Sequence, residues 1–214
     1  MDYLIKLLLA YLLGSVVGSL VVGRLRGGVD IRKLGSGNAG STNALRTQGL
    51  AFGIWVIVID VAKGWIAAAL VPAVTLPGIT PASAAQSGWL PAACGFAAIV
   101  GHVFPVWHGF RGGKGVATLV GAYAGLDPVL LAPLVVTWLV VVSVSGYVGL
   151  SSIIAALAIP VYLLLRDGAV TPLTGFALAA ALLVIYTHRG NVRRMRAGAE
   201  PRARKLWLFG RQRS

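Results

Sequence analysis

The chain has 214 residues, of which 57% are hydrophobic and only 12% are charged, and its mean hydropathy is +0.82. Soluble domains carry about 25% charged residues, so this composition excludes a water-facing globular surface. The apolar runs are unbroken and show no alternating strands of about ten residues, which excludes a membrane β-barrel and predicts an all-α, polytopic bundle of membrane helices.

The net charge of +13 is distributed unevenly along the chain. Of nineteen lysines and arginines, five lie in the first inter-helix loop, two in the central loop and nine after residue 188, so sixteen mark one side. By the positive-inside rule that side is cytoplasmic, where acidic headgroups attract the basic tail at about residues 196–214. Because the charge follows topology and forms no dedicated domain, we do not expect nucleic-acid binding. The N-terminal apolar segment is too long for a cleavable signal and ends in no small-residue cleavage site.

The apolar segments predict seven transmembrane helices in one domain spanning residues 1–214, with the N-terminus outside and the C-terminus cytoplasmic. We expect these helices at Tyr3 to about Gly23, about Leu50–Leu70, Leu90 to about Phe104, Val116–Leu126, Val129–Ser145, Ser151–Leu165 and Thr171–Thr187. The fourth is short, since about twelve helical residues span about 18 Å against a core of about 30 Å. This segment crosses a thin region of the membrane, is tilted, or is re-entrant. Five crossings plus a re-entrant pair would place the same loops on the cytoplasmic side.

The second predicted helix carries two ionisable residues at membrane depth, Asp60 and Lys63. Three residues apart, they share a helix face and can neutralise each other. Such residues usually face the bundle interior. Two interpretations of Asp60 and Lys63 therefore stand: an ion pair that holds two helices together, or a pair with a functional role.

Two glycine-rich, basic stretches interrupt the apolar pattern, GSGNAGSTNALR at 35–46 and GHVFPVWHGFRGGKGVAT at 101–118. Glycine amides can converge on an anion, and Lys114 adds a full charge within GGKG. The spacing is not that of a Walker A loop. Arg46 and Lys114 suit phosphate, the first as a bidentate fork and the second as a point charge. The two stretches together indicate an anionic, phosphate-bearing ligand at the membrane surface.

Other polar residues have competing interpretations. Ser36 is either a helix cap or a phosphate ligand, and His102 is more simply a structural donor than a chemical group. His188 and Asn191, three apart, share a helix face and are candidates for a functional role. The single cysteine, Cys94, excludes a disulfide framework. With no carboxylate near any histidine in sequence, we expect neither a metal nor a cofactor.

These motifs, together with GYVGLSS (146–152) and HRGNVRR (188–194), resemble the PlsY family of bacterial integral-membrane glycerol-3-phosphate acyltransferases. The resemblance covers the whole chain. It implies a seven-helix fold in the bacterial cytoplasmic (inner) membrane with a cytoplasm-facing site. The implied reaction transfers a fatty acyl group from acyl phosphate to the 1-hydroxyl of sn-glycerol 3-phosphate, giving lysophosphatidic acid and phosphate, the first step of phospholipid biosynthesis. A soluble acyl-phosphate-forming partner of the PlsX type is implied as well.

The resemblance implies that Ser36, Arg46, Lys114, Ser152, His188 and Asn191 line the site. We expect catalytic roles for Lys114, His188 and Asn191, and substrate or phosphate binding by Ser36, Gly37, Asn38, Thr42, Arg46, Gly112, Gly113, Lys114, Gly115 and Ser152. We expect structural or secondary roles for Asp60, Lys63 and His102. The family pattern leads us to expect a serine where this chain has Gly149, so that hydroxyl is absent.

Two other functions compete with this one. A membrane transporter of an organic phosphate would also need basic, glycine-rich loops, but the external loops offer almost nothing polar. An acyltransferase that uses a CoA or carrier-protein thioester commonly has an aspartate five residues after a histidine (HxxxxD). In this chain the residues five positions after His102, His108 and His188 are Trp107, Gly113 and Arg193, so the pair is missing. The general base is either His188 or the phosphate of the donor itself, whose second pKa would be about 6 by analogy with a phosphorylated side chain.

Overall fold

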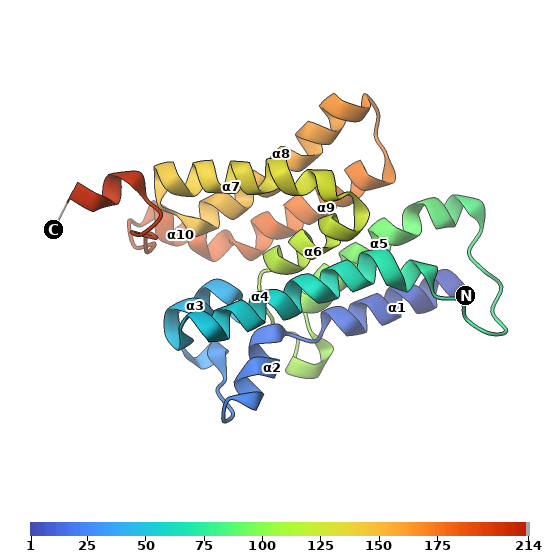
Figure 1. The fold of residues 1–214 in the computed structure, drawn as a ribbon, viewed down its shortest axis with the longest axis horizontal. Coiled ribbons are helices and arrows are strands. Elements are labelled where there is room, and N and C mark those ends of the chain that lie inside the picture. The colour runs from blue at the N-terminus through green and yellow to red at the C-terminus, as the bar shows by residue number, and fades with distance from the viewer. Residues whose placement is uncertain (213–214) are drawn as a thin grey trace. The chain divides into compact units, whose positions relative to one another are not determined.

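A computed structural model describes residues 1–212 of the chain, which are 74% helical and contain no strand. The chain forms two compact units, residues 1–128 and 129–214. The first contains α1 (Asp2–Gly14), α2 (Gly18–Leu25), α3 (Ser41–Gln48), α4 (Leu50–Trp65), α5 (Ala84–Val103) and α6 (Val116–Leu126). The second contains α7 (Leu131–Ser145), α8 (Val148–Asp167), α9 (Pro172–Thr187) and α10 (Arg189–Arg196). In each unit the long helices run side by side (Figure 1).

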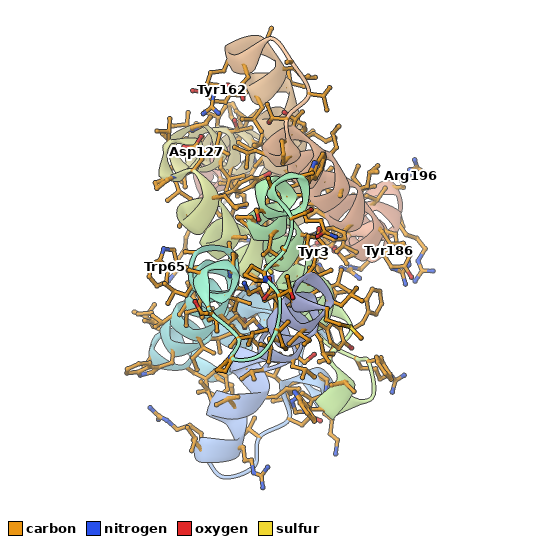
Figure 2. The ribbon with its side chains drawn as sticks, turned by 90° about the vertical axis from the view of Figure 1, so that its right-hand side faces the viewer. Tyr3, Trp65, Asp127, Tyr162, Tyr186 and Arg196 are labelled. Carbon is orange, nitrogen blue, oxygen red and sulfur yellow. The ribbon has the colours of Figure 1, made fainter. Side chains whose placement is uncertain are left out.

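Within residues 1–212, four helical segments are long and apolar enough to cross a membrane: 50–73, 84–108, 128–145 and 148–167. Two bent pairs, α1 with α2 and α9 with α10, raise the number to as many as six. Large apolar side chains project outward from these helices, as Trp65 does with 42% of its surface exposed (Figure 2). Such a surface suits lipid. The short α6 has the predicted bounds, and the number of seven crossings stays a prediction.

The first predicted helix is wrong as one continuous helix, because the chain breaks after Gly14 and bends by 47° into α2; the two helices together remain a candidate span. The break has a long-range cause. Lys63 Nζ, from α4, donates to Gly14 O at 2.9 Å and to Val16 O at 2.7 Å. Asp60 Oδ1, one turn earlier, accepts from Gly18 N at 3.0 Å. Backbone groups freed by the break are therefore satisfied by the two charges of α4.

Two other predicted boundaries also shift. The third helix begins at Ala84, not Leu90, because Ser83 and Gln86 form a capping box at its start. The helix predicted from Ser151 begins at Val148, so Ser151 and Ser152 lie in its first turns and not in the preceding break. Each hydroxyl donates to the carbonyl four residues earlier, which keeps these polar side chains compatible with the helix.

Small residues bring the helices of the first unit into backbone contact. A Cβ at Gly14 would overlap the backbone of Ala98 in α5, and one at Gly101 would overlap Tyr11 O in α1. Gly64 makes the same kind of approach to Thr118 O in α6. Close packing of this kind is typical of membrane helices, which have no hydrophobic drive to associate in lipid.

Candidate functional site

The first glycine-rich stretch is organised by Asn43, in the first turns of α3. Its amide Nδ2 donates to the carbonyls of Ile31, Leu34 and Asn38, at 2.9–3.1 Å, and its Oδ1 accepts from Ser36 N at 3.0 Å. The side chain is 3% exposed. One buried amide thus joins three carbonyls and one N–H of residues 31–38 and fixes the course of that segment.

This arrangement turns the candidate ligands outward. Ser36 and Thr42 are exposed, as is Arg46 in the last turn of α3. Within residues 1–212, no acidic side chain pairs with Arg46. The cap interpretation of Ser36 is wrong, because the cap of α3 is Gly40. Asn38 accepts from Gly40 N at 2.9 Å, so its side chain shapes the turn before α3.

The central loop (residues 104–115) folds back onto the end of α5. Gly112 N donates to Val103 O and Gly113 N to His102 O, both at 3.1 Å. A Cβ at Gly113 would overlap His102 Nε2, so only glycine fits against that ring. Gly115, with φ +83°, turns the chain into α6 through a conformation that other residues resist. Lys114 lies between these constrained glycines, half-buried.

Beneath this loop Asp60, Lys63 and His102 form a buried cluster. Lys63 Nζ lies 2.9 Å from Asp60 Oδ1 and 2.8 Å from His102 Nδ1. His102 Nδ1 is also 3.3 Å from Asp60 Oδ1, so it accepts from the ammonium or donates to the carboxylate. All three residues are at most 3% exposed. The predicted pairing of Asp60 with Lys63 is confirmed, and the pair joins α4 to both the α1–α2 break and α5.

A second tie joins the two glycine-rich segments at the surface. Arg32, in the short helix Ile31–Lys33, donates from Nη1 to His108 O at 3.1 Å and to Arg111 O at 3.2 Å. Its Nε and Nη2 donate to the carboxylate of Asp30. The hydrogen-bonded guanidinium of Arg32 lowers the pKa of Asp30 below its ordinary value. The structure therefore brings the segments bearing Ser36 and Lys114 to the same end of the first unit.

The second unit holds the other group of candidates. His188, 3% exposed at the bend between α9 and α10, has its Nδ1 2.8 Å from Val184 O. Because a carbonyl only accepts, Nδ1 carries the proton, which leaves the lone pair of a neutral ring on Nε2. Asn191 Nδ2 donates to Glu200 Oε1 at 2.6 Å, and Arg194 Nε donates to Glu200 Oε2 at 2.7 Å.

Ser152 and Gly149 lie on α8, one turn apart at most, in the same unit. A Cβ at Gly149 would meet the side chain of Asn191 at 2.9 Å. The glycine found where a serine is expected therefore makes room for Asn191. Ser152 is buried and donates to Val148 O at 3.0 Å.

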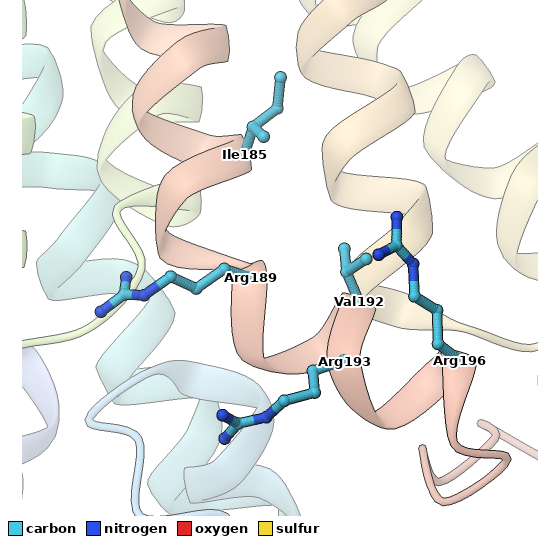
Figure 3. Close-up of a pocket in the computed structure, with 5 residues that line it drawn as sticks. All are labelled: Ile185, Arg189, Val192, Arg193 and Arg196. Atoms are coloured by element: carbon cyan, nitrogen blue, oxygen red, sulfur yellow. The ribbon is translucent and has the colours of Figure 1, made fainter.

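An open surface pocket of about 420 Å³ lies at the α9–α10 bend. It is lined by Ile185, Arg189, Val192, Arg193 and Arg196. Arg189 and Arg193 extend in the same direction from the bend, while Arg196 lies beside Val192 (Figure 3). Arg189 also stacks 4.1 Å from the ring of Tyr186 and donates to its carbonyl. The pocket offers guanidinium groups over an apolar floor.

Sequence reasoning missed three residues that organise these segments: Asn43, Arg32 and Glu200. Asn43 was visible as a polar residue in a capping-rich stretch, but its partners at Ile31 and Leu34 follow no local pattern. Glu200 carries a signal of its own, as one of six acidic residues in the chain, placed within a basic tail.

These features define a class: a helical membrane protein whose polar segments carry arginine, lysine and glycine residues of the kinds that suit an anionic ligand. A family model described as glycerol-3-phosphate acyltransferase matches residues 4–198. A protein named glycerol-3-phosphate acyltransferase from Chlorobaculum tepidum is 38% identical, with 99% of each chain covered. One of the same name from a Synechococcus species is 40% identical, over 93% of this chain and 94% of that one.

Two solved structures are similar as well. The crystal structure of PlsY (YgiH), an integral membrane glycerol 3-phosphate acyltransferase, in its glycerol 3-phosphate form has a TM-score of 0.80 and 33% identity, covering 94% of this chain and 96% of that one. The lysophosphatidic acid form has a TM-score of 0.81 and 34% identity, covering 98% of this chain and all of that one. The chain belongs to the glycerol-3-phosphate acyltransferase family and is an integral membrane protein.

Proposed function

We propose that this protein transfers a fatty acyl group from acyl phosphate to the 1-hydroxyl of sn-glycerol 3-phosphate, forming lysophosphatidic acid and inorganic phosphate. The observation that carries the proposal is the placement of two cations, Arg46 and Lys114, on two glycine-containing segments that Arg32 joins. Both substrates carry phosphate, so two cationic positions match their needs. The similar crystal structures, which are of a glycerol 3-phosphate form and a lysophosphatidic acid form, support the same acceptor and product here.

The chemistry needs little covalent help from the protein. The glycerol oxygen attacks the acyl carbonyl carbon, the new ester C–O bond forms, and the C–O bond to phosphate breaks. The hydroxyl proton passes to a base and the phosphate leaves with the bonding pair. Acyl phosphate is already activated, so positioning of the hydroxyl and stabilisation of the developing oxyanion carry the rate. Lys114 and the amides of the central loop supply that stabilisation in our mechanism.

We propose roles for the candidate residues of each unit by itself. In the first unit, Ser36, Gly37, Asn38, Thr42 and Arg46 would serve one phosphate, and Gly112, Gly113, Lys114 and Gly115 the other. In the second unit, Ser152 would bind substrate, and His188 and Asn191 would have catalytic roles. The Nδ1–H···O=C hydrogen bond of His188 to Val184 supports Nε2 as the proton acceptor. The alternative base is the phosphate of the donor.

The topology remains part of the proposal: seven crossings in the bacterial cytoplasmic membrane, with the N-terminus outside and the site facing the cytoplasm. A soluble enzyme of the PlsX type would supply the acyl phosphate at that face. The lysines and arginines gathered in the loops and after residue 188 support this orientation.

A donor-swap assay tests the reaction. Purified protein receives labelled glycerol 3-phosphate with palmitoyl phosphate, with palmitoyl-CoA or with neither, and lysophosphatidate is measured. We expect product only with palmitoyl phosphate. Product only with palmitoyl-CoA would overturn the proposal that acyl phosphate is the donor. Uptake of glycerol 3-phosphate into vesicles without product would favour a transporter.

Two variants then separate the roles within the site. Lys114→Ala should lower kcat by about 10²–10³-fold, the usual cost of removing an oxyanion donor. Lys33→Ala, which removes a lysine from the exposed surface of the first loop, is the matched control and should change little. His188→Ala should lower kcat by about 10²–10⁴-fold if the ring is the base. Retention of most of the kcat would assign the proton to the phosphate of the donor.

A further inference from the structure

Each of the three guanidinium nitrogens of Arg32 donates a hydrogen bond, and their acceptors lie in two parts of the first unit. On one side Nε and Nη2 donate to Asp30 Oδ1 and Oδ2, at 3.0 and 2.9 Å. On the other side Nη1 donates to the carbonyls of His108 and Arg111, at 3.1 and 3.2 Å. Asp30 also accepts from the backbone N–H of Arg32 at 3.0 Å. The carboxylate of Asp30 therefore fixes the orientation of the guanidinium of Arg32, so that Nη1 faces the carbonyls of the central loop.

The two ends of this contact lie close to the candidate phosphate ligands. Arg32 is four residues before Ser36, and the chain between them is held by Asn43. Arg111 is three residues before Lys114, and the chain between them is held by the amides of Gly112 and Gly113. With both segments constrained on either side, the hydrogen bonds of Arg32 set the separation of the first stretch from the central loop.

Other arginines of the same loop do not share this arrangement. Arg24 and Arg26 are exposed and, within the described residues, form no hydrogen bond or ion pair through their side chains. Arg32 is less exposed, with 28% of its side chain accessible, and Asp30 has 26%. A charge that served topology alone would need neither the carboxylate partner nor the two carbonyls. The sequence interpretation of Arg32 as one more cytoplasmic charge is therefore incomplete.

We propose that Arg32, held by Asp30, is a positioning residue that fixes the spacing between the two phosphate-binding segments and thereby sets the affinity for glycerol 3-phosphate. It contacts no substrate itself. The proposal rests on the proposed function of these segments. Because the contact pre-organises the site before binding, its loss adds an ordering cost to binding and raises KM more than it lowers kcat.

The kinetic test compares Arg32→Ala with Arg26→Ala, which removes the same charge from the same loop. We expect Arg32→Ala to raise KM for glycerol 3-phosphate about tenfold while kcat stays within about twofold, and Arg26→Ala to leave both unchanged. Asp30→Asn should raise KM less. The double variant Asp30→Asn, Arg32→Ala should match Arg32→Ala alone, since both changes act through one contact. Equal changes in KM in Arg26→Ala and Arg32→Ala would show that Arg32 acts only through its charge, and would overturn the proposal.

Arg32→Lys provides a second variant if Arg32→Ala does not fold. It keeps the charge but loses the planar fork, so it cannot hold Asp30 and both carbonyls together, and KM should rise by a smaller factor. An unchanged KM in a folded Arg32→Lys protein together with an unchanged KM in Asp30→Asn would overturn the proposal.

A spectroscopic measurement tests the spacing without turnover. Spin labels are attached at Gln48→Cys and Trp107→Cys, both exposed and both in the first unit; the native Cys94 is buried. The distance distribution should be narrow in the parent and broad in Arg32→Ala, and unchanged in Arg26→Ala. A distribution that stays narrow in Arg32→Ala would overturn the proposal. If the parent forms no lysophosphatidate, the proposed function fails, while the label distances still decide whether Arg32 fixes the spacing.

Discussion

Two acid–base pairs hold the central loop of the first unit, and they work in opposite surroundings. Asp60 and Lys63 are almost completely buried and lie with His102 below the loop. Asp30 and Arg32 lie at the surface, about a quarter exposed, and Arg32 contacts the loop through the carbonyls of His108 and Arg111. Both pairs satisfy backbone groups outside regular helix: Lys63 contacts the α1–α2 break, and Arg32 contacts the carbonyls of His108 and Arg111.

The comparison teaches how burial changes the role of the same chemistry. A buried charge that loses its partner keeps the full cost of desolvation, so the Asp60–Lys63 pair must stay complete for the unit to fold. An exposed pair loses little when it is broken, because water replaces the partner. The buried pair therefore determines whether the loop forms, and the surface pair adjusts where the formed loop lies.

The largest expected effect is from breaking the buried pair on one side. Lys63→Met should lower the free energy of unfolding of the first unit by about 3–5 kcal/mol, because Asp60 is left as an uncompensated buried charge. This loss of stability is larger because Asp60 Oδ2 has no hydrogen-bond partner within the described residues. Thermal unfolding in detergent, followed with size-exclusion chromatography, measures the loss.

Removing both charges provides the matched control. Asp60→Leu with Lys63→Met leaves no unpaired charge, so the double variant should unfold at a higher temperature than either single variant. It should stay below the parent, because Gly14 O, Val16 O and Gly18 N lose their partners. A double variant as unstable as the sum of the two singles would contradict the pairing argument.

A smaller effect is expected where the buried cluster meets the central loop. Gly113→Ala introduces a Cβ that overlaps His102 Nε2, and such overpacking typically costs about 1–3 kcal/mol. The loop and Lys114 must shift in response, so acyl transfer should fall by at least about tenfold. Gly88→Ala, where a Cβ meets nothing within 4 Å, is the control. Activity of Gly113→Ala equal to that of Gly88→Ala would show that His102 does not constrain the loop.

The sequence predicted those features that depend on residues close together in the chain. The bounds of α6 follow from an apolar run, and the pairing of Asp60 with Lys63 follows from a spacing of three. The third member of the buried cluster, His102, lies 39 residues beyond Lys63 and shares no local pattern with it. The break after Gly14 was missed for the same reason, because its cause lies 49 residues away in Lys63.

The candidate site divides in the same way. Glycine, arginine and lysine in short motifs predict phosphate binding by Arg46 and Lys114, and that role stays a prediction. The residues that hold those motifs in place could not be recognised, because Asn43 and Arg32 act on carbonyls and Glu200 acts on Asn191. Every residue has a backbone carbonyl, so a side chain that donates to one has no partner residue type that the sequence could reveal.

The smallest expected effect is the pH dependence of the surface pair. Arg32 lowers the pKa of Asp30 in the folded protein, so the pair contributes stability that is present above the unfolded pKa of about 3.9 and is lost as the pH falls through the lower folded value. Asp30→Asn should therefore unfold at a lower temperature than the parent at pH 6, by an amount that corresponds to at most about 1 kcal/mol. The difference should begin to shrink below about pH 4 and should vanish only below the folded pKa of Asp30, because protonation then removes the charge that the variant lacks. A difference that persists undiminished at pH 3 would mean that Asp30 acts through its shape and neutral hydrogen bonds, and the contrast with the buried pair would then not be one of charge.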